Sequence, residues 1–422
     1  MKNYQSIKGF YDVLPEKQKY WRFFYEAAYQ VLDRFTYEEI KLPIVENTDL
    51  YIHSVGEQTD IVEKEMYSWQ DNLNNDKLTL RPEGTAGCVR AVIENNLTYN
   101  GPIRLFYQGP MFRHENVQKG RQRQFNQLGI EAFGFSDPLV DAEIICLLDS
   151  LWKTLGLKNI ELQINNIGDP EERAVYRKEL IKYFESHQDE LDEDAKRRLH
   201  TNPMRILDSK NQKMQGLIDK APKFLDQNST ESAKHFEQVL QYLNQCNIPY
   251  KINKNLVRGL DYYNRTVFEF VTGDLGSQGT IAGGGRYDYL IQSINGKETP
   301  AFGVGIGIER IILLLEELNN TNFDITPQVY VVSLGENVDH YAFNISNQLR
   351  NSNISVCMNV GKNSFKSQMK KADKSGAQFA IIIGDNEVNN NSVQIKLLRQ
   401  ELSQEEINKK DIVNFITQHG SK

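Results

Sequence analysis

Leu256-Val-Arg-Gly-Leu-Asp-Tyr-Tyr263 is the most informative stretch of this chain, and Asn264-Arg-Thr-Val-Phe-Glu269 follows it directly. It places Arg258 beside a glycine, two tyrosines follow closely, and residues 266–271 have the composition of a strand. A fixed guanidinium suits a phosphate or a carboxylate, because its planar fork can donate two parallel hydrogen bonds. Paired tyrosines offer hydroxyls and apolar faces to a small planar ligand. Taken alone, the octapeptide also fits a strand with an arginine on a solvated edge, so the rest of the chain has to decide.

Further motifs stand in order along the rest of the chain. They are Asp12-Val-Leu-Pro15, Tyr37-Glu-Glu-Ile-Lys-Leu-Pro43, Thr79-Leu-Arg-Pro-Glu-Gly-Thr85, Phe112-Arg-His-Glu115 with Gly120-Arg-Gln-Arg-Gln-Phe-Asn-Gln-Leu-Gly-Ile-Glu131, Ala282-Gly-Gly-Gly-Arg-Tyr-Asp288 and Gly303-Val-Gly-Ile-Gly-Ile-Glu-Arg310. Together with 256–263, this ordered set resembles the histidyl-tRNA synthetases, a class II aminoacyl-tRNA synthetase family. The stretches 37–43, 112–131 and 303–310 look like class II motifs 1, 2 and 3. The resemblance covers nearly the whole chain.

Composition places the chain among ordinary globular proteins. Its 422 residues predict two to three domains, and 40% hydrophobic with 25% charged residues is typical of soluble proteins. No apolar run approaches the ~18 residues that a membrane span needs, and the first residues do not resemble a secretory signal. Four cysteines, at positions 88, 146, 246 and 357, lie far apart and are expected to be buried thiols in a reducing compartment. We therefore expect a cytoplasmic protein without a membrane partner.

Charge leaves the question of a nucleic-acid partner open. The net charge of −7 argues by itself against RNA binding. Residues 325–422 are slightly basic, however, and a local basic face matters more than the total charge for reaching a phosphate backbone. In that region Lys366, Lys370 and Lys374 share one face of a predicted helix, with Lys371 beside them. A merely solvated face would have the same pattern.

Apolar periodicity and turn residues indicate an α+β fold. Helices are predicted at 21–34 and 306–317, and strands at 40–45, 78–80, 103–109, 124–133, 267–271 and 302–305. Pro43 interrupts the first strand and so predicts a place at an edge or interface. Because loops rather than regular helices connect the strands, they predict an antiparallel sheet. Charged amphipathic helices are expected at 171–184, 192–199 and 229–244.

The last part of the chain predicts a separate α/β unit. Residues 323–328 have the composition of a linker. Strands and helices are then expected in alternation at 329–334, 340–352, 354–359, 365–375, 380–383 and 393–398, with the asparagines 389–391 at a loop tip. The resemblance implies a class II antiparallel-sheet catalytic core at 1–325 with a helical insertion at 171–252. It also implies a C-terminal α/β anticodon-binding domain at 326–422, and motif 1 with Pro43 implies a homodimer.

The implied reaction joins L-histidine to histidine tRNA, with ATP as substrate, through a histidyl-adenylate. Attack of a carboxylate on the α-phosphorus of ATP needs positioning and cations more than covalent chemistry. The resemblance makes Arg258 and Arg113 the catalytic residues at the α-phosphate. It assigns ATP binding to Arg113, Glu115, Arg121, Phe125 and Arg310, with Phe125 and Arg310 on the two faces of the adenine and Arg310 also at the terminal phosphate. Since the phosphates carry about four negative charges, Mg²⁺ is expected as a further neutraliser, without a metal site of the protein's own.

Histidine needs an anion for its ammonium group, cations for its carboxylate and polar groups at its ring nitrogens. The residues that the resemblance assigns to histidine are Glu83, Gly84, Thr85, Gln127, Glu131, Arg258, Tyr262, Tyr263 and Tyr287. Glu83 and Thr85 would hold the α-amino group, Gln127 the backbone end, and Glu131 with Tyr263 the ring. A simpler alternative is that Glu83 or Glu131 pairs with the neighbouring Arg81 or Arg90. Gly283–Gly285 lack the context of a nucleotide P-loop and are expected to let the backbone approach the substrate closely.

Some positions depart from the family pattern, and other functions remain open. Tyr289 stands where glycine is usual, Gln122 where tyrosine is common, and Asn116-Val117 where Arg-Pro is usual, which leaves acceptor-stem contacts undecided. One alternative is a non-enzymatic regulatory subunit of the first enzyme of histidine biosynthesis. Such paralogues lack the C-terminal domain and lose the histidine motifs, both of which this chain has. The others are a tRNA-binding module without aminoacylation and a synthetase for another amino acid, which the histidine motifs disfavour.

Overall fold

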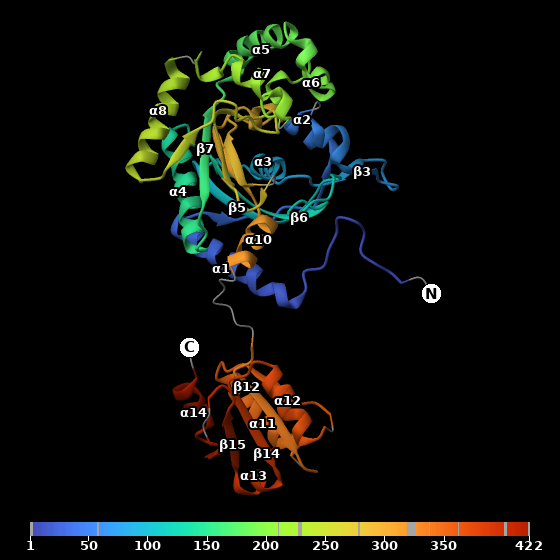
Figure 1. Cartoon of the computed structure of the whole chain (residues 1–422), viewed down its shortest axis with the longest axis vertical. Coiled ribbons are helices and arrows are strands. Elements are labelled where there is room, and N and C mark those ends of the chain that lie inside the picture. The colour runs from blue at the N-terminus through green and yellow to red at the C-terminus, as the bar shows by residue number, and fades with distance from the viewer. Residues whose placement is uncertain are drawn as a thin grey trace. The chain divides into compact units, whose positions relative to one another are not determined.

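The chain forms two compact units, Met1–Phe323 and Asp324–Lys422. The structure is a computed structural model, and it describes residues 3–56, 59–209, 211–226, 230–276, 279–318, 326–336, 338–361, 363–400 and 403–420. Each unit is described by itself (Figure 1). The predicted linker at 323–328 lies in part outside the described residues.

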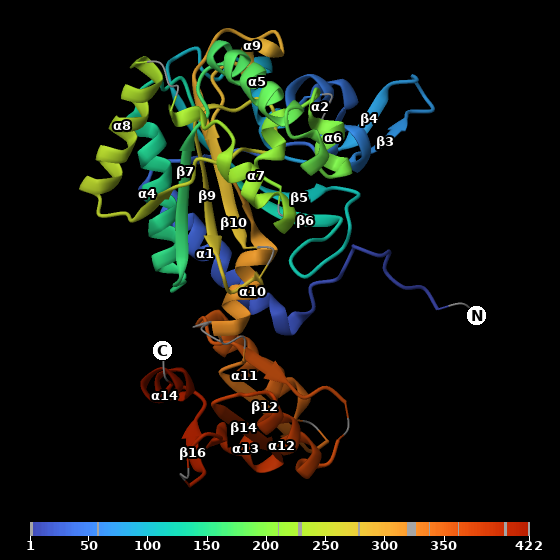
Figure 2. The same ribbon diagram turned by 45° about the horizontal axis from the view of Figure 1, so that its top comes forward.

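A large sheet forms the centre of the first unit (Figure 2). In spatial order its described strands are β1 (Glu38–Glu39), β5 (Ile103–Phe112), β6 (Gln124–Phe133), β11 (Ala301–Gly307), β10 (Thr280–Arg286), β9 (Asn264–Thr272), β7 (Ile160–Asn166) and β8 (Tyr250–Ile252). All neighbouring pairs from β5 to β7 are antiparallel, which confirms the expected core. The edge pairs β1–β5 and β7–β8 are parallel, which the sequence did not predict.

One face of this sheet carries the main hydrophobic core. Alternate residues of β6, β9 and β11, such as Ile130, Phe268 and Val304, point into one buried cluster, because successive side chains of a strand point to opposite faces. The helices that contribute to the cluster are α1 (Gln18–Arg34), α4 (Pro138–Thr154), α8 (Thr230–Gln245) and α10 (Ile308–Leu318). The other face of the same strands carries a second buried cluster, which includes Phe133, Val267 and Ala301, together with polar residues and glycines.

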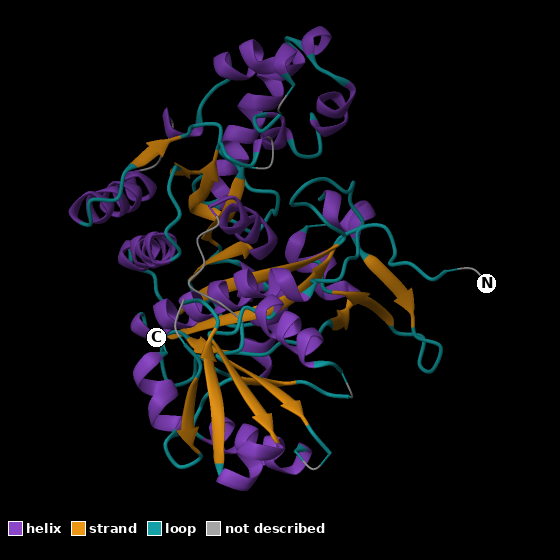
Figure 3. Ribbon diagram, turned by 60° about the horizontal axis from the view of Figure 1, so that its bottom comes forward, coloured by secondary structure: helices purple, strands orange, loops and turns teal. Residues whose placement is uncertain are grey.

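Helix α8 departs from the predicted insertion. The helices α5 (Pro170–Glu185), α6 (Glu193–Arg198) and α7 (Gln215–Lys220) share a hydrophobic cluster of their own, from Tyr176 to Phe224. Figure 3 shows them as an all-helical group. Phe236, Val239 and Leu243 of α8 instead belong to the main core with α4. Their spacing of three and four residues puts them on one helix face, which packs mainly against α4.

The stretch 40–45 is not the continuous strand that was predicted. A second sheet contains β2 (Val45–Asn47), β4 (Lys77–Leu80) and β3 (Tyr67–Gln70), next to α2 (Thr48–Val55), and the chain between β1 and β2 is irregular. Its carbonyl groups serve another purpose, since the Arg81 guanidinium donates to the carbonyls of Leu42 and Pro43 at 3.0 and 3.3 Å. Proline has no N–H for a strand ladder, so the segment is free to take this role.

The second unit has the predicted α/β architecture. Its described sheet has the order β13 (Val356–Met358), β12 (Val329–Leu334), β14 (Phe379–Gly384), β15 (Ser392–Leu397) and β16 (Glu405–Asn408). The helices are α11 (Asp339–Asn351), α12 (Phe365–Lys374), α13 (Asp385–Asn390) and α14 (Ile412–His419). The predicted loop tip at 389–391 is wrong in part, because Asn389 and Asn390 end α13. Asn391 then takes the left-handed conformation (φ 51°) that often follows a helix.

The fold bears on the expectations about the cysteines and about membrane spans. Cys88 is buried as predicted, but Cys146 and Cys357 are only half-buried and Cys246 is exposed. Cys246 directly follows the last turn of α8, where the helix ends at the surface. Among the described residues, no helix has the length and apolar character that a membrane crossing requires.

Candidate active site

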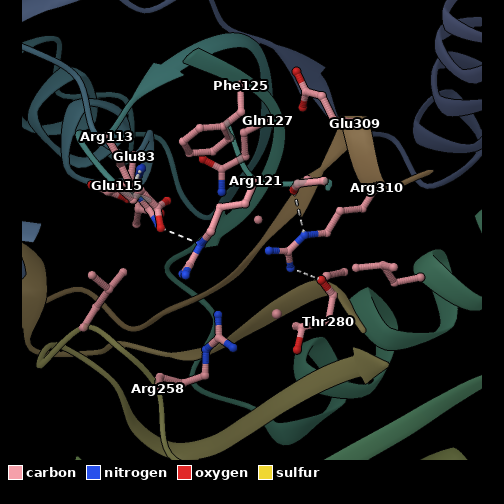
Figure 4. Close-up of a pocket in the computed structure, with 18 of the residues that line it drawn as sticks. Glu83, Arg113, Glu115, Arg121, Phe125, Gln127, Arg258, Thr280, Glu309 and Arg310 are labelled. Carbon is pink, nitrogen blue, oxygen red and sulfur yellow. Dashed lines mark hydrogen bonds and ion pairs between the residues drawn. The ribbon is translucent and has the colours of Figure 1, made fainter. Parts of the chain in front are cut away.

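A cavity of about 190 Å³ opens on the face of the large sheet opposite the main core. All the predicted site residues line it except Gly84, Glu131 and Tyr287. Figure 4 shows Arg258 on one wall, with Arg121 and Arg310 across the opening from it. The lining also includes Glu309, Thr280 and the backbone of Ala282 and Gly283.

Glycines make the floor of this cavity. The strand registers pair Gly129 with Gly305, Gly305 with Gly283, and Gly283 with Glu269, so one row of residues crosses four strands on the same face. A Cβ on Gly305 would lie 1.9 Å from Gln127 Nε2. At Gly303 a Cβ would lie 1.6 Å from Glu131 Oε2. The alternate glycines of 303–307 therefore leave room for the two polar side chains of β6.

Glu83 is fixed at the start of α3 (Thr85–Glu94). Its carboxylate accepts hydrogen bonds from the backbone N–H groups of Thr85 at 2.7 Å and Ala86 at 2.8 Å. Burial raises the pKa of Glu83, and these two donors oppose the rise. The alternative pairing with arginine does not occur, since Arg81 donates to backbone carbonyls and Arg90 pairs with Glu46 and Glu94.

Glu131 lies one layer below the cavity, where three hydroxyl groups hold it. Thr85 Oγ1 and Tyr107 OH each donate to Oε1 at 2.9 Å, and Tyr287 OH donates to Oε2. Burial raises the pKa of Glu131 to about 8, although these three donors lower it. Tyr107 itself fills the space above two glycines, because a Cβ on Gly84 or Gly129 would collide with its ring. Gly84 therefore affects the site through the packing of Tyr107, although it does not line the cavity.

Arg258 has both a fixed partner and an unsatisfied donor. Its Nη1 pairs with Glu269 Oε1, and Thr280 Oγ1 donates to the other oxygen of Glu269 at 2.9 Å. The guanidinium lies against Gly283, where a Cβ would approach it within 2.4 Å. Its Nε, although buried, has no hydrogen-bond partner among the described residues. A buried polar atom without a partner is costly, so this donor is well placed to receive a ligand.

Gln127, Tyr262 and Tyr263 complete this end of the cavity. Gln127 Oε1 is a second buried atom that has no partner within the described residues. The two tyrosine rings lie against each other with centroids 4.5 Å apart. Burial raises the pKa of both hydroxyls, so they remain neutral donors at physiological pH.

The other end of the cavity is rich in cations. Arg113 donates from Nε to the Pro82 carbonyl at 2.8 Å, and its guanidinium carbon lies 5.2 Å from the centroid of the Phe125 ring. Arg121 forms an ion pair with Glu115, drawn as a dashed line in Figure 4. Arg310 donates to the carbonyls of Thr280 and Gly120. Burial and, next, the charge of Arg121 lower the pKa of Arg310.

Several residues of the site were missed by sequence reasoning. Glu269 holds Arg258, Tyr107 holds Glu131, and Glu309 accepts from Tyr11 OH at 2.9 Å and from the Asn126 backbone N–H. Glu269 did carry a signal, since it is a lone acid on the strand that follows Arg258. The contact of Tyr107 with Glu131 depends on the β5–β6 register, so no local sequence pattern could have indicated it.

The structure explains the glycine triplet and locates two of the departures from the family pattern. Gly283 makes room for Arg258, as described, whereas Gly284 and Gly285 lie against the carbonyls of Gly303 and Thr266 on neighbouring strands. Close packing of strands thus accounts for two of the three glycines, which corrects the expectation that all of them serve the substrate. Gln122 lines the cavity, and Tyr289 is partly exposed outside it.

This arrangement brings both signs of charge into one cavity. Four arginines, Arg113, Arg121, Arg258 and Arg310, line it together with the carboxylates of Glu83, Glu115 and Glu309 and the hydroxyls of Tyr262 and Tyr263. A zwitterionic amino acid beside a polyphosphate matches this combination of charges.

Comparisons with known proteins match the two compact units of the chain separately. Residues 9–311 match the family described as histidyl-tRNA synthetase, and residues 328–419 match the anticodon binding domain family. A histidine--tRNA ligase of Methylobacillus flagellatus is 61% identical, over 94% of this chain and 95% of its own length. One of Laribacter hongkongensis is 49% identical over 98% of both chains. The crystal structure of apo S. aureus histidyl-tRNA synthetase superimposes with a TM-score of 0.82 at 35% identity, covering 98% of this chain and 100% of that one.

Proposed function

The chain belongs to the histidyl-tRNA synthetase family, and we propose that it ligates L-histidine to histidine tRNA through a histidyl-adenylate. The observation that carries the proposal is one cavity that holds four arginines together with Glu83, Gln127 and the paired Tyr262 and Tyr263. In the first step a carboxylate oxygen of histidine attacks the α-phosphorus of ATP, and diphosphate leaves. In the second step a ribose hydroxyl at the tRNA 3′ end displaces AMP.

The end of the cavity at Glu83, Tyr262 and Tyr263 fits histidine. We propose that Glu83, fixed by two backbone N–H groups, receives the α-ammonium group with Thr85 and with Gln127, whose buried Oε1 is an acceptor without a partner among the described residues. Arg258 would hold the histidine carboxylate, since its buried Nε is a donor without a partner among the same residues. Tyr262 and Tyr263 would line the ring. Glu131 would act on it from the layer below, with its orientation set by Tyr287. A buried polar site of this kind rejects ligands that leave its groups unpaired, often by ~10⁴-fold or more.

The arginine-rich end fits ATP. Arg113 and Arg258 would approach the α-phosphate from opposite walls (Figure 4), and Arg121 and Arg310 would meet the outer phosphates. Phe125 offers a ring for the adenine. The ion pair between Glu115 and Arg121 would have to open or share its cation with a phosphate.

Mg²⁺ is the expected companion of ATP. Within the described part of the chain, no group of three or more His, Cys, Asp or Glu side chains is arranged to hold a metal. We therefore propose that Mg²⁺ enters with the phosphates, where it neutralises part of their charge. Mg²⁺ usually takes only one or two carboxylates and keeps several waters. Glu115 and Glu309, which line the arginine-rich end, are carboxylates suited to this.

The C-terminal unit supports a tRNA substrate. We propose that its α/β domain binds the anticodon stem-loop through α12, on which Lys366, Lys370 and Lys374 are exposed. Deleting residues 326–422 should spare histidine adenylation far more than tRNA charging, as measured by diphosphate exchange and by aminoacylation of histidine tRNA. Equal loss of both activities would mean that the unit mainly stabilises the fold.

The assembly and compartment are also proposals. We propose a cytoplasmic homodimer, with motif 1 at 37–43 in the subunit interface. Sedimentation at micromolar concentration measures this state, and a species of 48.7 kDa would contradict the dimer.

Amino-acid-dependent exchange of diphosphate into ATP tests the activity itself. Histidine alone in a panel of amino acids should support exchange. No exchange with any amino acid would favour the regulatory subunit of histidine biosynthesis, and exchange with another amino acid would overturn the proposed specificity. Two features favour the enzyme over the regulatory subunit, namely the complete set of histidine motifs and the presence of the C-terminal unit.

A further inference from the structure

The outer side of the Arg258 loop, residues 256–263, is covered by the helical insertion. Arg173 of α5 donates from Nη1 to the backbone carbonyl of Tyr263. Asn202 Nδ2 donates to Asp261 Oδ1 at 3.0 Å. Arg205 lies against Gly259, where a Cβ would approach its Nη1 within 2.9 Å. The loop is therefore held from outside the cavity by residues that do not line it.

An apolar contact reinforces these polar ones. Met204 is partly buried and packs against two hydrophobic clusters. One is the core of the insertion, which includes Tyr176 and Leu207, and the other contains Tyr262 and Tyr263. Met204 thus lies between the hydrophobic core of the insertion and the pair Tyr262 and Tyr263, which line the cavity.

The segment that contains Asn202, Met204 and Arg205 also has contacts on its other side. Residues 202–206 include the 3-10 turn Pro203–Ile206, which follows α6. Arg198 and Arg205 approach Asp60 Oδ2 at 3.1 and 3.9 Å, and Asp60 precedes the helical turn Ile61–Glu65. In Figures 1 and 2, α6 lies beside α2, which leads into this part of the chain. The turn is therefore held between the Arg258 loop on one side and Asp60, which precedes the helical turn Ile61–Glu65, on the other.

Arg258 depends on its loop for its direction. Glu269 holds one nitrogen of its guanidinium, and the buried Nε has no partner among the described residues. A small shift of the loop would therefore move the guanidinium relative to bound ligands. Misplacing a reacting group by 1 Å can cost ~10²-fold in rate.

We propose that Arg173, Asn202 and Met204 of the helical insertion are positioning residues for Arg258, so that the insertion controls histidine activation from outside the cavity. This inference rests on the role proposed above for Arg258.

A double-mutant cycle on the full-length chain tests the proposal. Arg173→Met and Asn202→Ala should each lower the single-turnover rate of histidine adenylation by about tenfold and change the KM for ATP by less than about twofold. In an Arg258→Ala background the same substitutions should cost less than about twofold, because coupled residues give non-additive effects. Arg173→Lys should recover part of the rate, since its ammonium can still donate to the Tyr263 carbonyl. Lys178→Ala, on the exposed side of α5, is the matched control and should match the wild type.

The outcomes separate the two proposals. Equal losses in both backgrounds, or wild-type rates in Arg173→Met and Asn202→Ala, would overturn the positioning role while leaving Arg258 as proposed. A fully active Arg258→Ala variant would instead overturn the role of Arg258, and this inference with it. If Arg173→Met does not fold by circular dichroism, Asn202→Ala decides, because its hydrogen bond is exposed and contributes little to stability.

Discussion

The two ends of the cavity are built in different ways. At the end proposed for histidine (the histidine end), Glu83 and Glu131 accept hydrogen bonds from backbone N–H groups and from the hydroxyls of residues on strands and helices, so their positions are set before any ligand binds. At the end proposed for ATP (the ATP end), Arg113, Arg121 and Arg310 are long side chains held by backbone carbonyls or one ion pair. The polar groups of the histidine end are thus fixed by several hydrogen bonds, whereas the arginines of the ATP end can adjust their positions.

This difference matches what each ligand demands. A small amino acid is distinguished from its analogues only if the polar groups around it are fixed, because a misfit then leaves them unpaired. A triphosphate changes its charge distribution during the reaction, and several arginines can follow it at modest cost. We therefore expect substitutions at the histidine end to damage specificity, and substitutions at the ATP end to weaken binding gradually.

Arg258 lies between the two ends and should give the largest effect. Arg258→Ala should lower the adenylation rate by about 10²–10³-fold, because a preorganised cation at the developing phosphate charge is lost. Arg258→Lys should recover only part of the rate, since it keeps the charge without the two-pronged geometry. Diphosphate exchange measures adenylation, and transfer from preformed adenylate to tRNA should suffer less. Nearly normal exchange in the alanine variant would leave Arg258 only a structural role, as the partner of Glu269.

A glycine pair in β11 probes the rigid end. Gly305→Ala should raise the KM for histidine by about tenfold, because the new methyl group would meet Gln127 Nε2 and overpacking of this kind costs ~1–3 kcal/mol. At Gly307 a Cβ would meet its nearest neighbour, Arg310 Cδ, at an ordinary 3.9 Å. Gly307→Ala should therefore leave the histidine KM far less affected. Similar values for the two variants would show that the floor of the cavity adapts, contrary to the comparison.

Arg121 tests whether the ATP end is adjustable. Its side chain is 41% exposed, so solvent weakens its interactions. Arg121→Ala should raise the KM for ATP only a few-fold, since exposed charge pairs contribute at most ~1 kcal/mol. The KM for histidine should be unchanged. A loss as large as that of Arg258→Ala would mean that the two ends are equally rigid.

Glu131 should give the most pH-dependent effect. Burial raises its pKa to about 8, above the ordinary value of a glutamate. Between about pH 4.5 and about pH 8 the folded protein keeps a proton that the unfolded chain has released, so the stability of the wild type falls as the pH rises. Glu131→Gln has no such proton. The difference between the urea midpoint of Glu131→Gln and that of the wild type should therefore increase from about pH 5 to about pH 8 and be constant above that.

Parallel urea midpoints across this range would contradict the raised pKa of Glu131. The carboxylate would then be ionised throughout, stabilised by Thr85, Tyr107 and Tyr287. The histidine end would still be rigid, but it would hold a permanent negative charge.

The limits of sequence reasoning are visible in particular elements. Strand β6 and helix α1 were predicted closely, because their apolar periodicity is local. Residues 40–44 were predicted as strand and are not, since a proline and a distant arginine redirect their carbonyl groups. Helix α8 was predicted correctly as a helix but was assigned to the insertion, because periodicity defines a helix face without saying which surface covers it.

The sequence by itself determined the family, the order of the motifs and the residue types that line the cavity. A motif preserves chemistry over a few neighbouring residues, and those can be recognised without knowing the fold. Only the tertiary structure decided that glycines of β10 and β11 leave room for Arg258, Gln127 and Glu131, that Tyr107 holds Glu131, and that the insertion covers the Arg258 loop. These contacts join residues far apart in the chain, so they depend on strand register and helix packing, which local patterns do not encode.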